Sequence, residues 1–232
     1  MAKHKIVPRK DWITARKKLL VEEKKFSRLR EKLSEKRRQL PWVKVEKNYS
    51  FDGPQGQETL SDLFGKRSQL VVYHFMFGPG WKQGCAHCSF WADHYDGMEV
   101  HLNHRDVSFA VISRAPLAEI KPFKKRMGWR FKWVSSGRND FNYDFHVSFR
   151  PEEIKTGSVF YNYEKTKMGG MTDREGISVL TKDKSGNIFH TYSTFARGID
   201  AVNPTYQFLD LVPKGRDEHG RGQFWVRYKD RY

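Results

Sequence analysis

The sequence has very little cysteine and no long apolar run. Its only cysteines are Cys85 and Cys88, which excludes a framework of structural disulfides and a zinc site built from four cysteines. The longest mainly apolar stretch, LVVYHFMF, is far shorter than the roughly 20 residues that a membrane-spanning helix needs. The basic N-terminal segment is not followed by the apolar stretch of a secretory signal peptide. We therefore expect a cytoplasmic protein without a membrane partner.

Positive charge is abundant but concentrated in one segment. The net charge is +16, and residues 1–47 contribute +11 of it, from 17 lysines and arginines against 6 acidic residues. Only +5 is left for the rest of the chain. A nucleic-acid-binding protein usually gathers its charge on the folded surface that contacts phosphates. The distribution therefore argues against nucleic acid as a partner.

Residues 1–47 are predicted to form a basic helical extension. We expect the helix to begin with Asp11 as its N-terminal cap and to run to about Gln39, because Pro41 stops it. Its apolar residues recur every seven positions, at Trp12, Leu19, Phe26, Leu33 and Leu40. The second seam that a coiled coil needs is half polar, at Ala15, Glu22, Leu29 and Lys36. This pattern predicts one narrow stripe that packs on the domain or on a second copy, which allows a homodimer; the basic face can also simply be solvated.

The central segment, residues 48–212, is predicted to form one α/β domain, followed by an aromatic and basic tail over residues 213–232. Apolar patterns predict a short strand over 49–52, buried strands over 70–75 and 107–113, and a third short strand over 131–136. Helices are expected over 61–65, 117–127 and 203–211, and a hairpin over 176–195. Parallel strands followed by a hairpin are typical of the thioredoxin fold, a central mixed sheet flanked by helices.

Both cysteines lie where the first buried strand leads into a helix. A Gly-Pro-Gly turn precedes them, and the residues after them can be helical to about Asn103. A cysteine at a helix N-terminus is favoured as thiolate by the helix dipole and by unpaired backbone N–H groups. We predict that Cys85 is a nucleophile and that Cys88 resolves it through an intramolecular disulfide. A cationic His87 would favour the thiolate further and make the dithiol relatively oxidising.

Two other uses of this cysteine pair stay open. The two thiolates and a histidine can bind copper or zinc, and His74 in the preceding strand is the candidate. The simpler interpretation of His74 is a hydrogen-bonded core residue. The cysteine pair can also be inert. A haem attachment motif is excluded, because it needs histidine directly after the second cysteine and Ser89 stands there.

Further candidates surround the dithiol. The aromatic residues that can floor an apolar substrate groove, or else simply form core, are Trp81, Phe90, Trp91, Phe141, Tyr143 and Phe145. Arg114 and Arg174 are placed beside the dithiol by the ends of the predicted strands, where they would favour thiolate. The histidines that would share one face of the predicted helix are His87, His94 and His101. Neighbours in that series would lie about 10.5 Å apart along the axis, so they cannot all bind one ion.

Long blocks of the sequence resemble one bacterial family. The blocks are YHFMFGPGW, CAHCSFWAD, VISRAPLAEIKPFKKRMGW, DFNYDF, TYSTFARGID and DLVPKGRDE. With the N-terminal pattern W-x-x-A-R-K-x-L-L-x-x-E-K, they resemble nearly end to end the thioredoxin-like family classed as domain of unknown function 899. The resemblance implies the fold, and fold alone does not fix function. Other segments are more distantly similar to peroxiredoxins.

The dithiol departs from these relatives. Thioredoxins have Trp-Cys-Gly-Pro-Cys, whereas here Trp81 lies four residues before Cys85. The inner pair, Ala86 and His87, looks more like the Pro-His of oxidising disulfide oxidoreductases. Peroxiredoxins need threonine three positions before the nucleophile, and Lys82 stands there, so a fast peroxidase is not supported.

A second departure lies before the predicted hairpin. Thioredoxins have a cis-proline there, facing the dithiol, and this chain has Arg174, Glu175 and Gly176. The loss of that proline argues against ordinary thioredoxin substrate binding and leaves space for a metal.

These observations lead to one main hypothesis, a thiol–disulfide oxidoreductase that needs no cofactor. Its catalytic residues would be Cys85, Cys88 and His87, and its substrate-binding residues Trp81, Phe90, Trp91 and Arg174. Its partners would be a protein or small-molecule disulfide and a cellular thiol reductant. The alternatives are a copper- or zinc-binding protein, and an interaction protein whose basic helix recruits a partner.

Overall fold

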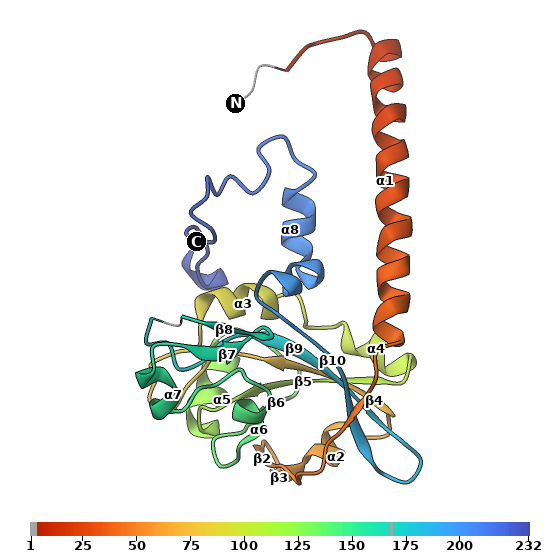
Figure 1. Cartoon of the computed structure of the whole chain (residues 1–232). Helices are drawn as coiled ribbons and strands as arrows, with labels where there is room; N and C mark the ends of the chain where they lie inside the picture. The colour runs from red at the N-terminus through yellow and green to blue at the C-terminus, as the bar shows by residue number, and fades with distance from the viewer. Residues whose placement is uncertain (1–3, 168) are drawn as a thin grey trace. The chain divides into compact units, whose positions relative to one another are not determined.

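The computed structural model describes residues 4–167 and 169–232 and divides the chain into two compact units (Figure 1). The first unit ends at Pro41, and the second runs from Trp42 to Tyr232. Residues 1–3 of the predicted extension lie outside the described part, and residues 42–47 belong to the second unit, as does the predicted tail. None of the helices in the described ranges is both long and apolar enough to cross a membrane.

The first unit contains one long helix, α1 (Arg9–Arg38). The prediction of an N-terminal cap at Asp11 is wrong. Pro8 precedes the helix, and no side chain caps it. Asp11 lies in the first turn, where its negative charge is stabilised by the positive end of the helix dipole. No residue of α1 is buried. The apolar stripe is exposed too, by 47% at Trp12 and 68% at Phe26.

The second unit is built on a mixed sheet whose described strands follow the order β1-β10-β9-β4-β5-β6-β2-β3. Their bounds are β1 (Val43–Lys44), β2 (Ser50–Gly53), β3 (Gly56–Thr59), β4 (Gln69–His74), β5 (Val107–Ser113), β6 (Trp133–Ser135), β9 (Gly176–Lys182) and β10 (Ile188–Phe195). β4, β5 and β6 run in parallel, whereas β9 is antiparallel to β4, and β10 to β9. A second, two-stranded sheet joins β7 (Val159–Tyr161) and β8 (Glu164–Thr166).

Short helices connect these strands. They are α2 (Leu60–Leu63), α3 (Ala86–Ala92), α4 (Glu99–His104), α5 (Leu117–Arg126), α6 (Phe141–Asp144), α7 (Pro151–Lys155) and α8 (Pro204–Leu209), with 3-10 helices η1 (Ala196–Val202) and η2 (Lys229–Arg231). The prediction of a helix from the dithiol to Asn103 is wrong. α3 ends at Ala92 and α4 begins at Glu99, and Gly97 between them adopts a φ of 89°, so the two helices are separate. Consequently, His87, His94 and His101 do not share one helix.

Alternation along β4 separates two cores, because successive strand side chains point to opposite faces. Tyr73 contributes to a cluster with α3 and α5, whereas Leu70 and Val72 contribute to a cluster with α2 and α6. The sheet therefore has helices on both faces (Figure 1). The strand order, with a β4-α3-α4-β5-α5-β6 crossover and a β9-β10 hairpin, is that of a thioredoxin-like fold. This confirms the predicted fold class.

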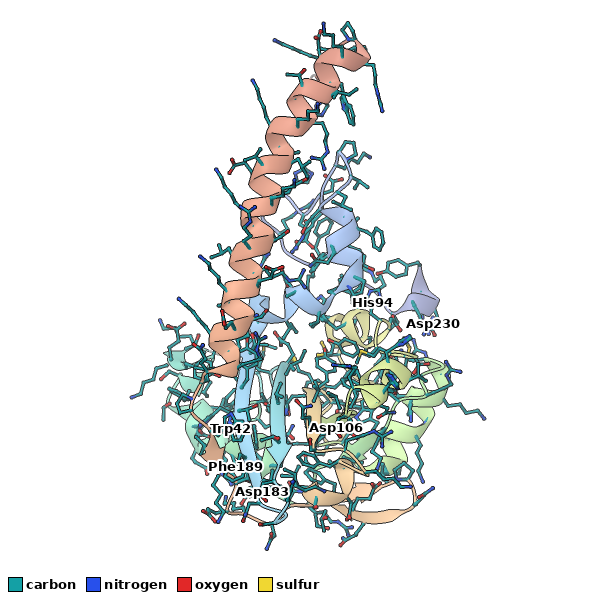
Figure 2. The ribbon with its side chains drawn as sticks, turned by 90° about the vertical axis from the view of Figure 1, so that its right-hand side faces the viewer. Trp42, His94, Asp106, Asp183, Phe189 and Asp230 are labelled. Carbon is teal, nitrogen blue, oxygen red and sulfur yellow. The ribbon has the colours of Figure 1, made fainter. Side chains whose placement is uncertain are left out.

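The far edges of the sheet hold elements that the sequence pattern did not reveal. β1 pairs with β10, and the Trp42 ring lies 5.9 Å from Phe189 across that pair (Figure 2). The strands β3, β7 and β8 were also not predicted, because each has only three or four residues. The predicted β9-β10 hairpin is confirmed, and Asp183 closes its turn by accepting backbone N–H bonds from Ser185 and Asn187 (Figure 2).

His74 is a core residue, as the simpler interpretation predicted. Its Nε2 lies 2.8 Å from Ser178 Oγ, and its ring stacks on Phe141 at 5.8 Å between centroids. It is fully buried. Burial, helped by repulsion from His190, lowers the pKa of His74 to about 3. The imidazole is therefore neutral in the folded protein.

We expect His74 to make stability depend on pH. Its folded pKa lies below the unfolded value of about 6.5, so stability is intact above pH 6.5 and falls as pH drops toward 3, by about 1.4 kcal/mol per pH unit for this one proton. Urea unfolding at several pH values should show a shallower decline in His74→Gln, which keeps a polar group beside Ser178. Parallel stability profiles for the two proteins would contradict the assignment.

Candidate active site

The backbone before α3 fixes the position of the first cysteine. The Cys85 N–H donates to the Met76 carbonyl at 3.0 Å, which folds the loop after β4 back on itself. At Gly84 an added Cβ would lie 2.5 Å from the Phe75 ring and 2.9 Å from the Phe123 ring. Only glycine therefore fits directly before Cys85. The Gly84 carbonyl in turn accepts the Tyr228 hydroxyl at 2.6 Å.

Cys85 and Cys88 differ in environment although they are one helical turn apart. Cys85 is the N-terminal cap of α3, and its Sγ accepts the Cys88 N–H at 3.5 Å. Both thiols are free. Cys85 is half-buried, whereas Cys88 is only 2% exposed and belongs to the core cluster behind it. A molecule that approaches from solvent can therefore reach Cys85 first.

The electrostatics separate the two thiols further. The pKa of Cys85 lies well below its ordinary value, chiefly because the Cys88 thiol hydrogen-bonds to it, and also because of a hydrogen bond from His87; burial opposes both effects. Burial raises the pKa of Cys88 well above the ordinary value. The hydrogen bond to Cys85 raises the pKa of His87. A Cys85 thiolate beside a His87 imidazolium is the favoured pair.

A cavity of about 360 Å³ opens in front of the dithiol. Besides the cysteines and His87, it is lined by Met76, Trp91, Met171, Arg174, Glu175, Ala196, Arg197, Asp200, Tyr206, Glu218, Gly222 and Gln223. Most of these residues come from the segment before β9, from η1, from α8 and from the C-terminal segment. Of these, the sequence pointed to Arg174 beside the dithiol. It did not assign a role at the dithiol to the others, because they approach the cysteines only in the folded chain.

The C-terminal segment 213–232 contributes Glu218, Gly222 and Gln223 to the lining of this cavity. Val226 is buried in the same core cluster as Cys88, and the Trp225 ring contacts Phe90 at 5.3 Å. Asp230 accepts two hydrogen bonds from Arg126 of α5, at 2.8 and 2.9 Å. The segment is thus attached to the domain at several points and forms part of the site.

Glu175 supplies a carboxyl group next to the dithiol. It stands directly before β9, at the position where the resemblance to thioredoxins placed a proline. Burial is the main cause that raises its pKa, and the charge of Cys85 adds to the effect. Its backbone carbonyl accepts the Tyr161 hydroxyl at 2.9 Å. Only its place before the predicted hairpin pointed to it from the sequence.

The aromatic candidates are divided between the two faces of the sheet. Trp91 lines the cavity and donates its indole N–H to the Ile199 carbonyl at 2.9 Å. Phe90 is buried in the core, and Trp81 packs against that core away from the cavity lining. Phe141 and Phe145 pack in the cluster on the opposite face. The structure therefore does not assemble these residues into one groove.

The two candidate arginines lie in different environments. Arg174 lines the cavity, and its guanidinium lies 5.8 Å from the Tyr161 ring centre. Arg114 instead forms two hydrogen bonds with Asp173, at 2.9 and 2.7 Å, and donates to Tyr143. Arg114 therefore holds the segment before β9 in place through Asp173.

Of the candidate histidines, His87 lies beside Cys85, whereas His74 and His94 have other partners. His74 faces the cluster with Phe141, opposite the dithiol, so the idea that it tunes or shares a site with Cys85 and Cys88 is wrong. His94 pairs with Thr205 Oγ1 at 2.9 Å beyond the end of α3 (Figure 2). Within residues 4–167 and 169–232, no three His, Cys, Asp or Glu side chains are grouped to hold a metal ion.

Replacing His87 with alanine should raise the pKa of Cys85, because the thiolate loses a hydrogen bond and a neighbouring positive charge. The measurement is the rate of Cys85 alkylation against pH, resolved from Cys88 by mass spectrometry. The matched control is His94→Ala, which should keep the wild-type profile. A His87→Ala profile identical to wild type would show that the imidazole does not act on Cys85.

Comparison with known proteins identifies the family. One similar solved structure is peroxidoxin BcpB from Mycobacterium tuberculosis, with 12% identity and a TM-score of 0.45; the match covers 72% of this chain and 95% of that chain. Another is a peroxiredoxin Q mutant from Xanthomonas campestris, with 15% identity and a TM-score of 0.44; the match covers 68% of this chain and 90% of that chain. A peroxiredoxin 6 mutant from Arenicola marina is also similar, with 14% identity and a TM-score of 0.46; the match covers 68% of this chain and 65% of that chain. A search of curated proteins finds no match. The family model described as "Bacterial protein of unknown function (DUF899)" matches residues 1–232, and the chain therefore belongs to this family.

Proposed function

We propose that the chain is a thiol–disulfide oxidoreductase with Cys85 as nucleophile and Cys88 as resolving thiol. The observation that carries the proposal is the asymmetry of the two thiols. Cys85 borders the cavity, accepts hydrogen bonds and has a lowered pKa, whereas Cys88 is buried behind it with a raised pKa. Such an arrangement supports one reactive thiolate with a protonated thiol held in reserve.

The reaction would proceed in two exchange steps. The Cys85 thiolate attacks one sulfur of a substrate disulfide, forms a mixed disulfide and expels the other sulfur as a thiolate. Cys88 then loses its proton, attacks Cys85 Sγ and expels the second substrate thiolate. Two electrons pass from the dithiol to the substrate. Glu175, a buried carboxyl beside the pair, is the proposed acceptor of the Cys88 proton.

The environment of Cys85 favours the reduced form of the dithiol. Hydrogen bonds that lower the pKa of a thiol stabilise its thiolate, so the corresponding disulfide becomes a stronger oxidant. We therefore propose that the oxidised protein can pass its disulfide to other thiols. The proposed partners are a protein or small-molecule disulfide on one side and a cellular thiol reductant on the other.

The N-terminal helix is proposed as a surface for association with a second copy of the chain. Its apolar stripe is exposed at Trp12, Phe26 and Leu33, and no residue of α1 is buried. A stripe of this kind is stabilised when another apolar face covers it.

Substitution of each cysteine tests the proposed reaction. With a peptide disulfide as substrate, Cys85→Ser should abolish turnover, because serine cannot replace the thiolate. Cys88→Ser should accumulate a mixed disulfide at Cys85, visible by intact mass spectrometry. The control for unspecific thiol reactivity is Cys85→Ser combined with Ser185→Cys, which places an ordinary thiol in an exposed turn. Normal turnover by Cys85→Ser would overturn the proposal.

A further inference from the structure

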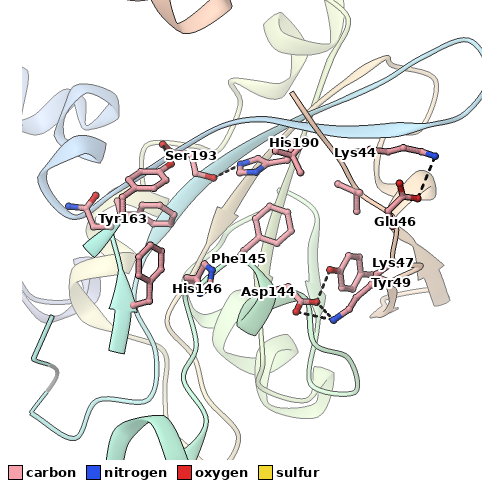
Figure 3. A pocket seen from close by; sticks show the side chains of 15 residues that line it. Lys44, Glu46, Lys47, Tyr49, Asp144, Phe145, His146, Tyr163, His190 and Ser193 are labelled. Carbon is pink, nitrogen blue, oxygen red and sulfur yellow. Dashed lines mark hydrogen bonds and ion pairs between the residues drawn. The ribbon is translucent and has the colours of Figure 1, made fainter. Parts of the chain in front are cut away.

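A second cavity lies at the edge of the large sheet, separate from the dithiol (Figure 3). It encloses about 420 Å³ and shares no lining residue with the dithiol cavity. Its walls come from β1 and the residues after it, from α6, from the β7-β8 hairpin and from β10. The aromatic side chains in the lining are Tyr49, Phe145, Phe160, Tyr163 and Phe195. The cavity has the size and composition of a small-molecule site.

The charged groups around this cavity already have partners. Lys47 Nζ lies 2.7 Å from Asp144 Oδ2, which also accepts the Tyr49 hydroxyl at 2.7 Å (Figure 3). Lys44 pairs with Glu46 at 3.4 Å. A charged ligand would therefore lose hydration without gaining an unpaired counter-charge. The lining favours an uncharged ligand.

One wall is formed by residues in an uncommon backbone conformation. Asn162 and Tyr163 have φ values of 52° and 67°, and His146, whose ring lies 4.9 Å from Phe160 of the same hairpin, has a φ of 52°. Two positive φ values are what a two-residue hairpin turn such as β7-β8 requires, and glycine usually takes the second position. Here a tyrosine takes it. Strained residues of this kind are concentrated at functional sites.

The Tyr163 ring is held in place although it is 64% exposed. Its hydroxyl donates to the Ser193 carbonyl at 2.9 Å, and its ring lies 5.7 Å from Phe195. Figure 3 shows Tyr163 on the same side of the cavity as Ser193. The strained turn thus presents a fixed aromatic ring to the cavity.

The cavity also has a neutral polar wall. His190 Nε2 lies 2.7 Å from Ser193 Oγ, and the His190 ring contacts Phe145 edge to face at 5.1 Å (Figure 3). Ser193 Oγ lies 2.7 Å from Ser178 Oγ, which reaches His74. This chain of hydroxyl and imidazole groups can reorient its protons to donate to or accept from a ligand.

We propose that this cavity binds a small uncharged aromatic molecule carrying one hydroxyl or carbonyl group. Its rings would pack between Tyr163, Phe145 and Phe160 in offset or edge-to-face contacts. Its polar group would face the His190 and Ser193 side chains. The site does not depend on the dithiol chemistry, because the two cavities have no residue in common.

The test uses 2-naphthol as an uncharged aromatic probe and naphthalene-2-sulfonate as its anionic counterpart, with the full-length protein at pH 7. Calorimetric titration should detect 2-naphthol binding, and the sulfonate should bind at least about tenfold more weakly because its charge must be desolvated. No detectable binding of 2-naphthol, or equal affinity for the two probes, would overturn the proposal.

Tyr163→Gly separates binding from folding. Glycine suits the positive φ, so the thermal unfolding midpoint should stay the same or rise, while 2-naphthol affinity should fall at least about tenfold with loss of the ring. Phe160→Ala should also weaken 2-naphthol binding, and it replaces Tyr163→Gly as the test if Tyr163→Gly is destabilised. Phe208→Ala, which removes an aromatic ring that is 70% exposed on α8, is the matched control with unchanged affinity.

The oligomeric state provides the remaining test. If a dimer forms that excludes 2-naphthol and dissociates in Tyr163→Gly, the cavity is a contact between copies of the chain and the small-molecule proposal fails. If Tyr163→Gly and Phe160→Ala both bind 2-naphthol with the affinity of the wild type, the probe binds elsewhere and the proposal also fails.

Discussion

The position of β4 in the centre of the sheet is the constraint on which the dithiol depends. It is hydrogen-bonded on both edges, in parallel to β5 and antiparallel to β9, and its side chains are buried on both faces. A strand held in this way cannot slip by one residue without turning every side chain to the other core. Its carboxyl end therefore fixes Phe75 and Met76, and the hydrogen bond from the Cys85 N–H to the Met76 carbonyl fixes the dithiol.

The dithiol is then completed by segments remote from it in the sequence. Gly84 allows Phe75 and Phe123 to approach the backbone, and its carbonyl holds Tyr228 of the C-terminal segment. Arg114 holds Asp173, and Glu175 follows two residues later. Both attachments bring polar side chains toward a cysteine pair that otherwise lies among aromatic core residues. The difference in pKa between Cys85 and Cys88 comes chiefly from the hydrogen bonds that Cys85 accepts at the start of α3 and from the burial of Cys88.

The β9-β10 hairpin connects the two cavities structurally. Glu175, directly before β9, lines the dithiol cavity, whereas Ser193 and Phe195 of β10 line the second one. Gly176 pairs with both His74 and Phe195, and an added Cβ there would collide with the Phe195 ring. The absence of a side chain at this position lets Phe195 lie close to the start of β9. The hairpin and the residue before it thus contribute to the walls of both cavities.

The sequence by itself determined the order of buried strands, the β9-β10 hairpin and the junction that carries Cys85 and Cys88, because these depend on local alternation and on turn residues. It placed His74 in the core for the same reason. It could not reveal short strands such as β7 and β8, and it did not reveal that α3 ends at Ala92. Only the tertiary structure decided which residues meet the dithiol. Glu175, Glu218 and Gln223 reach it through long-range contacts, whose partners no local pattern encodes. Tertiary packing likewise placed Phe141 and Phe145 on the opposite face, since the face on which a side chain lies depends on how the strands and helices assemble.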